Sequence, residues 1–161
     1  MFITIQHKIS IAQEMYIGYK PKILKDDTVT YWLSQLHKYI TKREKQLVKS
    51  GIAEACKICE EEMGGSCCGK GIENIYDQWM LLINILLGCN LPIQRYKPDS
   101  CFFLGERGCI LKVPHVLCIN YICKKLEQEI SKKQLFVLRQ IEGEMINSVF
   151  YLREYLLKIL S

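Results

Sequence analysis

All nine cysteines of this 161-residue chain lie between Cys56 and Cys123. None occurs in the first 55 residues or in the last 38. Thiols that served only as small apolar side chains would be scattered through every helix that meets the core. Confinement to one interval therefore predicts a local role for sulfur, which is to bind a metal ion or an iron-sulfur cluster.

The length of the chain and its first residues indicate where it works. The chain is long enough to bury a hydrophobic core, so disulfides are not needed as its main source of stability. Its start lacks the basic segment, apolar segment and cleavage site of a secretory signal peptide. We therefore expect a cytoplasmic location, where clustered cysteines bind metals or do redox chemistry more often than they form disulfides.

Charge and hydropathy disfavour two classes of partner. The longest apolar runs, such as residues 79–87, are far shorter than the roughly 20 residues of a transmembrane helix, so no membrane partner is expected. The net charge of +5 is mild. The densest basic run, at residues 38–49, has helical spacing and no accompanying aromatic binding motif, which indicates a solvated helix face and argues against nucleic acid.

Hydrophobic residues at helical spacing predict a mostly α fold, a small helical bundle in a single domain over residues 1–161. Its Cys-rich metal-binding core, at 56–123, would contain a long irregular loop at 93–116, where prolines and glycines interrupt the hydrophobic period. Such a loop is uncommon unless function or a bound group fixes it. The predicted helices lie at about residues 27–50, 52–63, 73–87 and 131–160, with a break near 130–133.

The N-terminal residues are harder to assign. Asp26 or Asp27 is suited to cap the helix at 27–50, and Gly51 to end it. Pro21 is expected to separate that helix from residues 1–24. Those residues fit either a short strand or a helical turn, and we expect them to form an arm packed on the domain.

The C-terminal helix has an apolar stripe at three- and four-residue spacing, which is suited to packing within the bundle. Glu142 and Gly143 interrupt this stripe. Phe136, Phe150 and Tyr151 widen the apolar surface. A homodimer through this helix, or another protein partner, therefore stays open.

The cysteines supply more than the four ligands that closed zinc sites and iron-sulfur clusters commonly use. Cys56 and Cys59 would share one face of a helix. Cys67 and Cys68 should diverge in regular structure, although flanking glycines would let both reach one ion. Cys89, at a helix end, is expected to pack rather than to bind metal.

One histidine is a candidate ligand. His115 stands three residues before Cys118 and could complete a mixed Cys and His zinc site. A partly exposed loop histidine is the simpler interpretation.

The second half of the interval resembles a known family. A Cys-Cys pair in a Gly-rich turn is followed, after a helix, by Cys101-Phe-Phe-Leu, Gly108-Cys109-Ile, Pro114-His-Val-Leu-Cys118 and Cys123. This arrangement resembles the cysteine-cluster family of zinc- or iron-chelating domains, the CxxCxxCC type, over about residues 56–123. Upstream, the family has cysteines where this chain has Glu60 and Gly64, and Cys56 and Cys59 would replace them in a shifted register.

The resemblance implies a protein that binds iron or zinc for a redox or metal-handling role. Thiols far outnumber histidines, so we prefer a 4Fe-4S cluster to a zinc or iron ion. The best ligand set is Cys68, Cys101, Cys109 and Cys118, followed by Cys59, Cys67 and Cys123, and then by Cys56.

Two other functions stay open. Flagellin lysine N-methylase resembles the same family, so a protein-modifying enzyme is one alternative, although no Gly-rich methyl-donor fingerprint is visible. A structural zinc module for protein interaction is the other. The sequence does not decide whether the chain is an enzyme.

Overall fold

The computed structural model of the chain describes residues 3–62 and 67–161, so Gly64 and Gly65 of the glycine-rich turn lie outside the described residues. The elements confirm the mostly α prediction. They are α1 (Ile5–Lys25), α2 (Asp27–Lys49), α3 (Ile52–Glu62), the 3-10 helix η1 (Ile72–Ile75), α4 (Gln78–Leu86), β1 (Leu104–Gly105), β2 (Gly108–Cys109), α5 (Val116–Asn120), α6 (Lys124–Glu129) and α7 (Lys132–Leu160).

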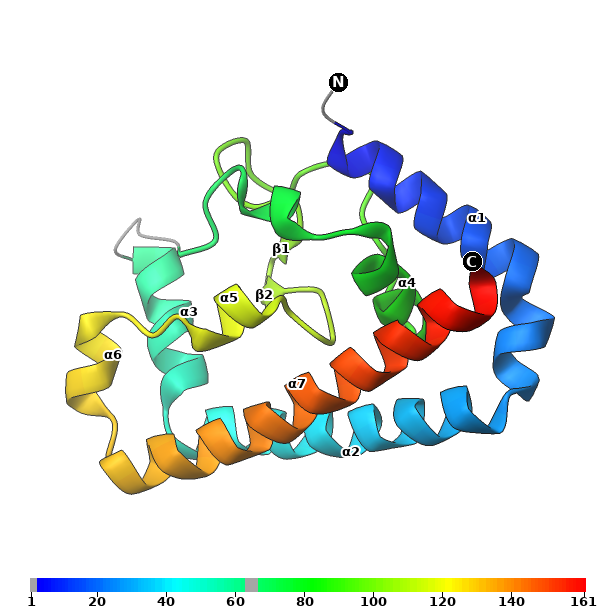
Figure 1. Ribbon diagram of the computed structural model, residues 1–161. Coiled ribbons are helices and arrows are strands. Elements are labelled where there is room, and N and C mark those ends of the chain that lie inside the picture. Colours follow the sequence, from blue (N-terminus) through cyan, green and yellow to red (C-terminus); the bar gives the residue numbers. More distant parts are fainter. Residues whose placement is uncertain (1–2, 63–66) are drawn as a thin grey trace.

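Two long helices form the frame of the molecule. Helices α2 and α7 pack along each other, and α1 packs against α4 (Figure 1). Helices α3, α5 and α6 gather away from α1, at the left of Figure 1, and the β1–β2 hairpin lies between the two regions. The segments that carry the cysteines are therefore held by the same frame.

The apolar stripe predicted for the C-terminal helix is buried. Its fully or nearly covered members are Leu138, Met145, Val149, Leu152 and Leu156. The helix begins after Ser131, whose hydroxyl accepts a hydrogen bond from the N–H of Gln134 at 3.2 Å, so the predicted break near residues 130–133 is confirmed. Among the described residues, no helix combines the length and apolar character that crossing a bilayer requires.

The predicted break at Pro21, and the strand considered for residues 1–24, are wrong. Helix α1 runs through Pro21 without interruption. Ile5, Ile9 and Ala12 are buried at helical spacing, and Ile23 is buried beyond the proline. Burial of this face outweighs the hydrogen bond that proline removes, which costs about 3 kcal/mol in a helix interior.

The start of α2 follows its predicted cap. Asp26 accepts hydrogen bonds from the backbone N–H groups of Thr28 at 2.9 Å and Val29 at 3.0 Å, so Asp26 and not Asp27 is the N-cap. Gly51, with a φ of 80°, follows the last turn as expected.

The helix predicted at 73–87 is two elements, not one. Tyr76 and Asp77 separate η1 from α4, and the Asp77 carboxylate accepts a hydrogen bond from the N–H of Met80 at 2.9 Å. An aspartate is more stable as an N-cap than in a helix interior, because there its oxygen bonds an otherwise unpaired N–H. The division frees Tyr76 to turn into the core, where it is 2% exposed.

The irregular loop predicted at 93–116 contains an unpredicted hairpin. Leu104 pairs with Cys109 and Gly105 with Gly108 in an antiparallel register. Glu106 and Arg107 form the two-residue turn, and Gly108 has a φ of 103° that suits glycine. Cys109 therefore stands on a short ladder rather than on an irregular segment.

Candidate metal centre

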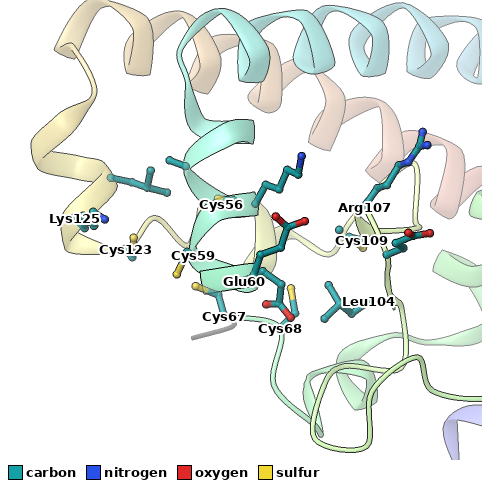
Figure 2. A pocket seen from close by; sticks show the side chains of 16 residues that line it. Cys56, Cys59, Glu60, Cys67, Cys68, Leu104, Arg107, Cys109, Cys123 and Lys125 are labelled. Carbon is teal, nitrogen blue, oxygen red and sulfur yellow. The ribbon is translucent and has the colours of Figure 1, made fainter. Parts of the chain in front are cut away.

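Six of the nine cysteines line one cavity of about 250 Å³, between α3, the hairpin and the start of α6 (Figure 2). They are Cys56, Cys59, Cys67, Cys68, Cys109 and Cys123. Two of the predicted site residues, Cys101 and Cys118, do not line this cavity. The thiols do not form a single set, because electrostatic interactions divide them into two groups.

The hairpin group consists of Cys68, Cys101, Cys109 and Cys118. Cys109 is exposed by its surface area, yet desolvation of its thiol, together with the thiolates of Cys68, Cys101 and Cys118, raises its pKa to about 12. Partial burial likewise raises the pKa of Cys68 to about 11, with Cys101 and Cys118 as its strongest thiol neighbours. Repulsion between thiolates falls with distance and with hydration, so it is felt only between thiols that lie near one another. The four thiols therefore share one locality.

Backbone hydrogen bonds position three members of this group. The N–H of Cys101 donates to the carbonyl of Cys68 at 2.6 Å, and Gly69 forms a bridge with Ser100. Cys109 belongs to the hairpin that follows Cys101 along the chain. Backbone pairing thus brings the segment of Cys68 next to the segment of Cys101, although the two are distant in sequence.

A buried ion pair fixes the loop that precedes Cys101. Arg95 donates to the Glu73 carboxylate and, at 2.5 Å, to the carbonyl of Ser100. Glu73 is 1% exposed and also accepts from the N–H of Gly71 at 2.9 Å. Burial alone would raise the pKa of Glu73, but the hydrogen bonds from Arg95 and from the backbone lower it overall.

This ion pair makes the loop sensitive to acid. A carboxylate whose pKa is lower in the folded chain stabilises the fold fully above its unfolded value of about 4.3, and the stabilisation is lost as the pH falls through the folded value. We expect the urea midpoint of the wild-type chain to drop between pH 6 and pH 3.5. In Glu73→Gln the drop should be smaller, and the midpoint at pH 6 should already be lower. An identical pH profile in both chains would contradict this assignment.

The fourth member of the hairpin group, Cys118, is held by Tyr76. The Tyr76 hydroxyl accepts from the N–H of His115 at 2.7 Å and donates to the Cys118 sulfur at 4.0 Å. Burial raises the pKa of Tyr76 strongly, so the hydroxyl stays protonated as a donor. No feature of the sequence distinguished this tyrosine from an ordinary core residue.

We expect Tyr76→Phe to lower the free energy of unfolding by about 1–3 kcal/mol, because the N–H of His115 loses its partner inside the protein. The same change should make the Cys118 thiol react faster with a soluble disulfide reagent. Tyr96→Phe, which alters an exposed tyrosine, is the matched control and should leave stability within about 0.5 kcal/mol. Equal losses in both variants would refute the role given to Tyr76.

His115 has a structural use. Its Nδ1 accepts a hydrogen bond from the N–H of Leu117 at 3.2 Å, which caps the start of α5. The side chain is half-buried. This agrees with the simpler interpretation of His115 as a loop histidine, and it leaves the hairpin group with sulfur donors.

The α3 group consists of Cys56, Cys59, Cys67 and Cys123. Cys56 and Cys67 are exposed, but their thiols are partly desolvated. This partial desolvation raises the pKa of Cys56, and the thiols of Cys67, Cys123 and Cys59 also raise it. The pKa of Cys67 is raised in the same way, first by desolvation and then by Cys123 and Cys59. Cys59 and Cys67 lie next to each other in Figure 2. These four thiols form a second locality.

Adjacent residues connect the two groups. Cys67 interacts with the α3 group, whereas the strongest thiol neighbours of Cys68 are Cys101 and Cys118. This placement agrees with the expectation that neighbouring side chains diverge.

Cys89 stands apart from both groups. It is 9% exposed, its thiol donates to the Asn84 side chain at 3.6 Å, and it accepts from the N–H of Lys112 at 3.3 Å. The prediction that Cys89 packs in the core is confirmed.

The donor chemistry of both groups fits a soft metal, because each offers four thiols. Within residues 3–62 and 67–161, however, no three Cys, His, Asp or Glu side chains already surround a point where an ion would sit. Binding would require the thiols to change rotamer toward one another.

Comparisons with known proteins add no functional assignment. No protein-family model, curated protein or solved structure matches this chain, so the functional argument depends on the residues of the site itself.

Proposed function

We propose that the chain is a metal-binding protein whose centre is held by the hairpin group, Cys68, Cys101, Cys109 and Cys118. One observation supports this most strongly: four thiols from separate segments share a locality in which each thiolate would be repelled by the others. A cation would remove that repulsion, and without one the arrangement opposes the ionised form that binds metal.

The centre is proposed to be a 4Fe-4S cluster, with a single zinc or iron ion as the alternative. A cluster supplies one-electron transfer when bound, which fits a redox role. The chain itself would supply four thiolates and the Tyr76 hydrogen bond to Cys118, and hydrogen bonds to ligand sulfurs are among the factors that set cluster potentials. The Glu73–Arg95 pair would hold the Cys101 loop against the Cys68 segment.

The test is purification under strict anaerobic conditions, followed by measurement of iron, zinc, acid-labile sulfide and the visible spectrum. Brown protein with matching iron and sulfide would support the cluster. Colourless protein with stoichiometric zinc would support a structural ion at the same residues. Folded protein without metal, even after reconstitution with iron and sulfide or with zinc, would refute the proposal.

A structural zinc module for protein interaction is a second candidate, favoured by the exposed aromatic face of α7. Phe136, Phe150 and Tyr151 are 63%, 57% and 53% exposed, and Trp32 of α2 stacks on Tyr151 with ring centroids 5.0 Å apart. Light scattering tests self-association through this face. If the wild-type chain is a dimer and Phe150→Glu is a monomer, the interaction module is supported. If the wild-type chain is a monomer at high concentration, the homodimer is refuted.

A further inference from the structure

The cysteines outside the proposed centre also converge from separate segments. Cys56 and Cys59 lie three residues apart on α3, Cys67 follows in the next described segment, and Cys123 comes from the link between α5 and α6. The three segments meet at one end of the cavity (Figure 2). Chance burial of thiols does not explain this convergence, because Cys56 and Cys67 are exposed.

Helix geometry suits α3 to chelation. Side chains three residues apart on a helix have Cβ atoms about 5–6 Å apart. A tetrahedral zinc site with Zn–S bonds of about 2.3 Å needs its sulfurs roughly 3.8 Å apart. Rotation about χ1 can close that difference for Cys56 and Cys59 without unwinding the helix.

The other two ligands are compatible with the same point. Cys123 occupies the N-cap position of α6 with an extended backbone, and its side chain makes no capping hydrogen bond. Cys67 receives a hydrogen bond from the Tyr121 hydroxyl, two residues before Cys123. That contact draws the two segments together.

Charged side chains of both signs line the same cavity. Its three cations, Lys57, Arg107 and Lys125, are balanced by the carboxylates of Glu60, Glu61 and Glu106. Four free thiolates would add four negative charges to this lining, whereas four thiolates around a divalent cation carry a net charge of about −2. A bound cation therefore lowers the repulsion among the thiolates.

We infer that Cys56, Cys59, Cys67 and Cys123 form a second metal site, independent of the hairpin group, that binds one soft divalent cation such as Zn²⁺. This goes beyond the proposed function and uses none of its ligands. The Cys67–Cys68 peptide joins the two sites. The α3 site ties α3 to α6 across the cavity mouth, where the more exposed thiols make its ion the more exchangeable of the two.

The test is a titration of the reduced, metal-free full chain with Co²⁺ under argon, followed by Zn²⁺ displacement and metal analysis. Cobalt bound by four thiolates gives intense charge-transfer absorption, so the total number of bound equivalents can be counted, and the variants assign them to the two sites. We expect two equivalents in the wild-type chain. Cys56→Ser/Cys123→Ser should bind one equivalent, Cys109→Ser/Cys118→Ser should bind the other, and Cys89→Ser should still bind two.

The outcomes separate this inference from the proposed function. Two outcomes overturn the inference. If the wild-type chain binds one equivalent and each double variant loses it, the thiols form a single shared centre. If the wild-type chain binds one equivalent and Cys56→Ser/Cys123→Ser still binds it, the α3 group binds no metal. One equivalent lost only in Cys56→Ser/Cys123→Ser would support it while refuting the hairpin centre. Failure of Cys109→Ser/Cys118→Ser to fold leaves the wild-type count and the Cys56→Ser/Cys123→Ser variant decisive.

Discussion

The double variant Cys109→Ser/Cys118→Ser is expected to lose the metal proposed for the hairpin group, and with it most of the stability of the segments that such a metal would join. Serine hydroxyls do not ionise near neutral pH and are poor ligands for iron-sulfur clusters and for zinc. The binding free energy of a structural site contributes to folding free energy, and in small zinc domains it reaches about 10–16 kcal/mol. Metal analysis and thermal unfolding measure the two consequences.

Cys89→Ser is the matched control for that variant. It exchanges the same atoms at a buried position, and its hydroxyl can keep the bond to Asn84. We expect normal metal content and a smaller loss of stability. Full metal content in Cys109→Ser/Cys118→Ser would remove both residues from the ligand set, whatever its effect on stability.

The helices that could be predicted are those whose signals are local. The stripe of α7 and the Asp26 cap of α2 depend on residues within one or two turns, so the sequence is enough to place them. The predictions of a break at Pro21 and of one helix at 73–87 are wrong because both depend on packing across the molecule. Burial of one face stabilises α1 on both sides of Pro21. Tyr76 is buried in the core at the point where Asp77 caps α4 and the predicted helix is divided.

The sequence could indicate which thiols gather in the chain but not which structural elements bring them together. Clustering of thiols is visible in the sequence, and the best set inferred there is the hairpin group. The assignment of Cys67 and Cys68 to different groups depends on the unpredicted hairpin and on how α3 and α6 approach each other. The Tyr76 hydrogen bond and the Glu73–Arg95 pair connect residues more than 20 positions apart, so no local pattern announces them.

The site also depends on a charged group that the sequence presented as a defect. Glu142 interrupts the apolar stripe of α7, yet it is 2% exposed and paired with Arg43 of α2 at 3.0 Å and Arg139 at 2.8 Å. Arg139 also donates to the carbonyls of Ile119 at 2.8 Å and Asn120 at 3.0 Å. These bonds tie α5, which carries Cys118, to the α2–α7 frame.

The variant Arg43→Met/Arg139→Met is therefore expected to lose about 3 kcal/mol of unfolding free energy. Removing both partners leaves the Glu142 carboxylate buried without compensation, and breaking a buried ion pair costs about 3–5 kcal/mol. The lower end applies because the two arginine side chains are 20% and 32% exposed, which lets water reach the pair. Methionine keeps the apolar stem of each arginine, so the change isolates the charge.

Addition of Glu142→Met to that variant provides the decisive comparison. If the uncompensated carboxylate causes the loss, the triple variant should recover most of it, because an apolar set of similar volume can replace a buried ion network. Urea unfolding measures the recovery, and thiol labelling of Cys118 shows whether α5 remains loosened by the lost carbonyl contacts. A triple variant as unstable as the double would mean that the arginine bonds to α5, and not the charge on Glu142, hold the frame and the site together.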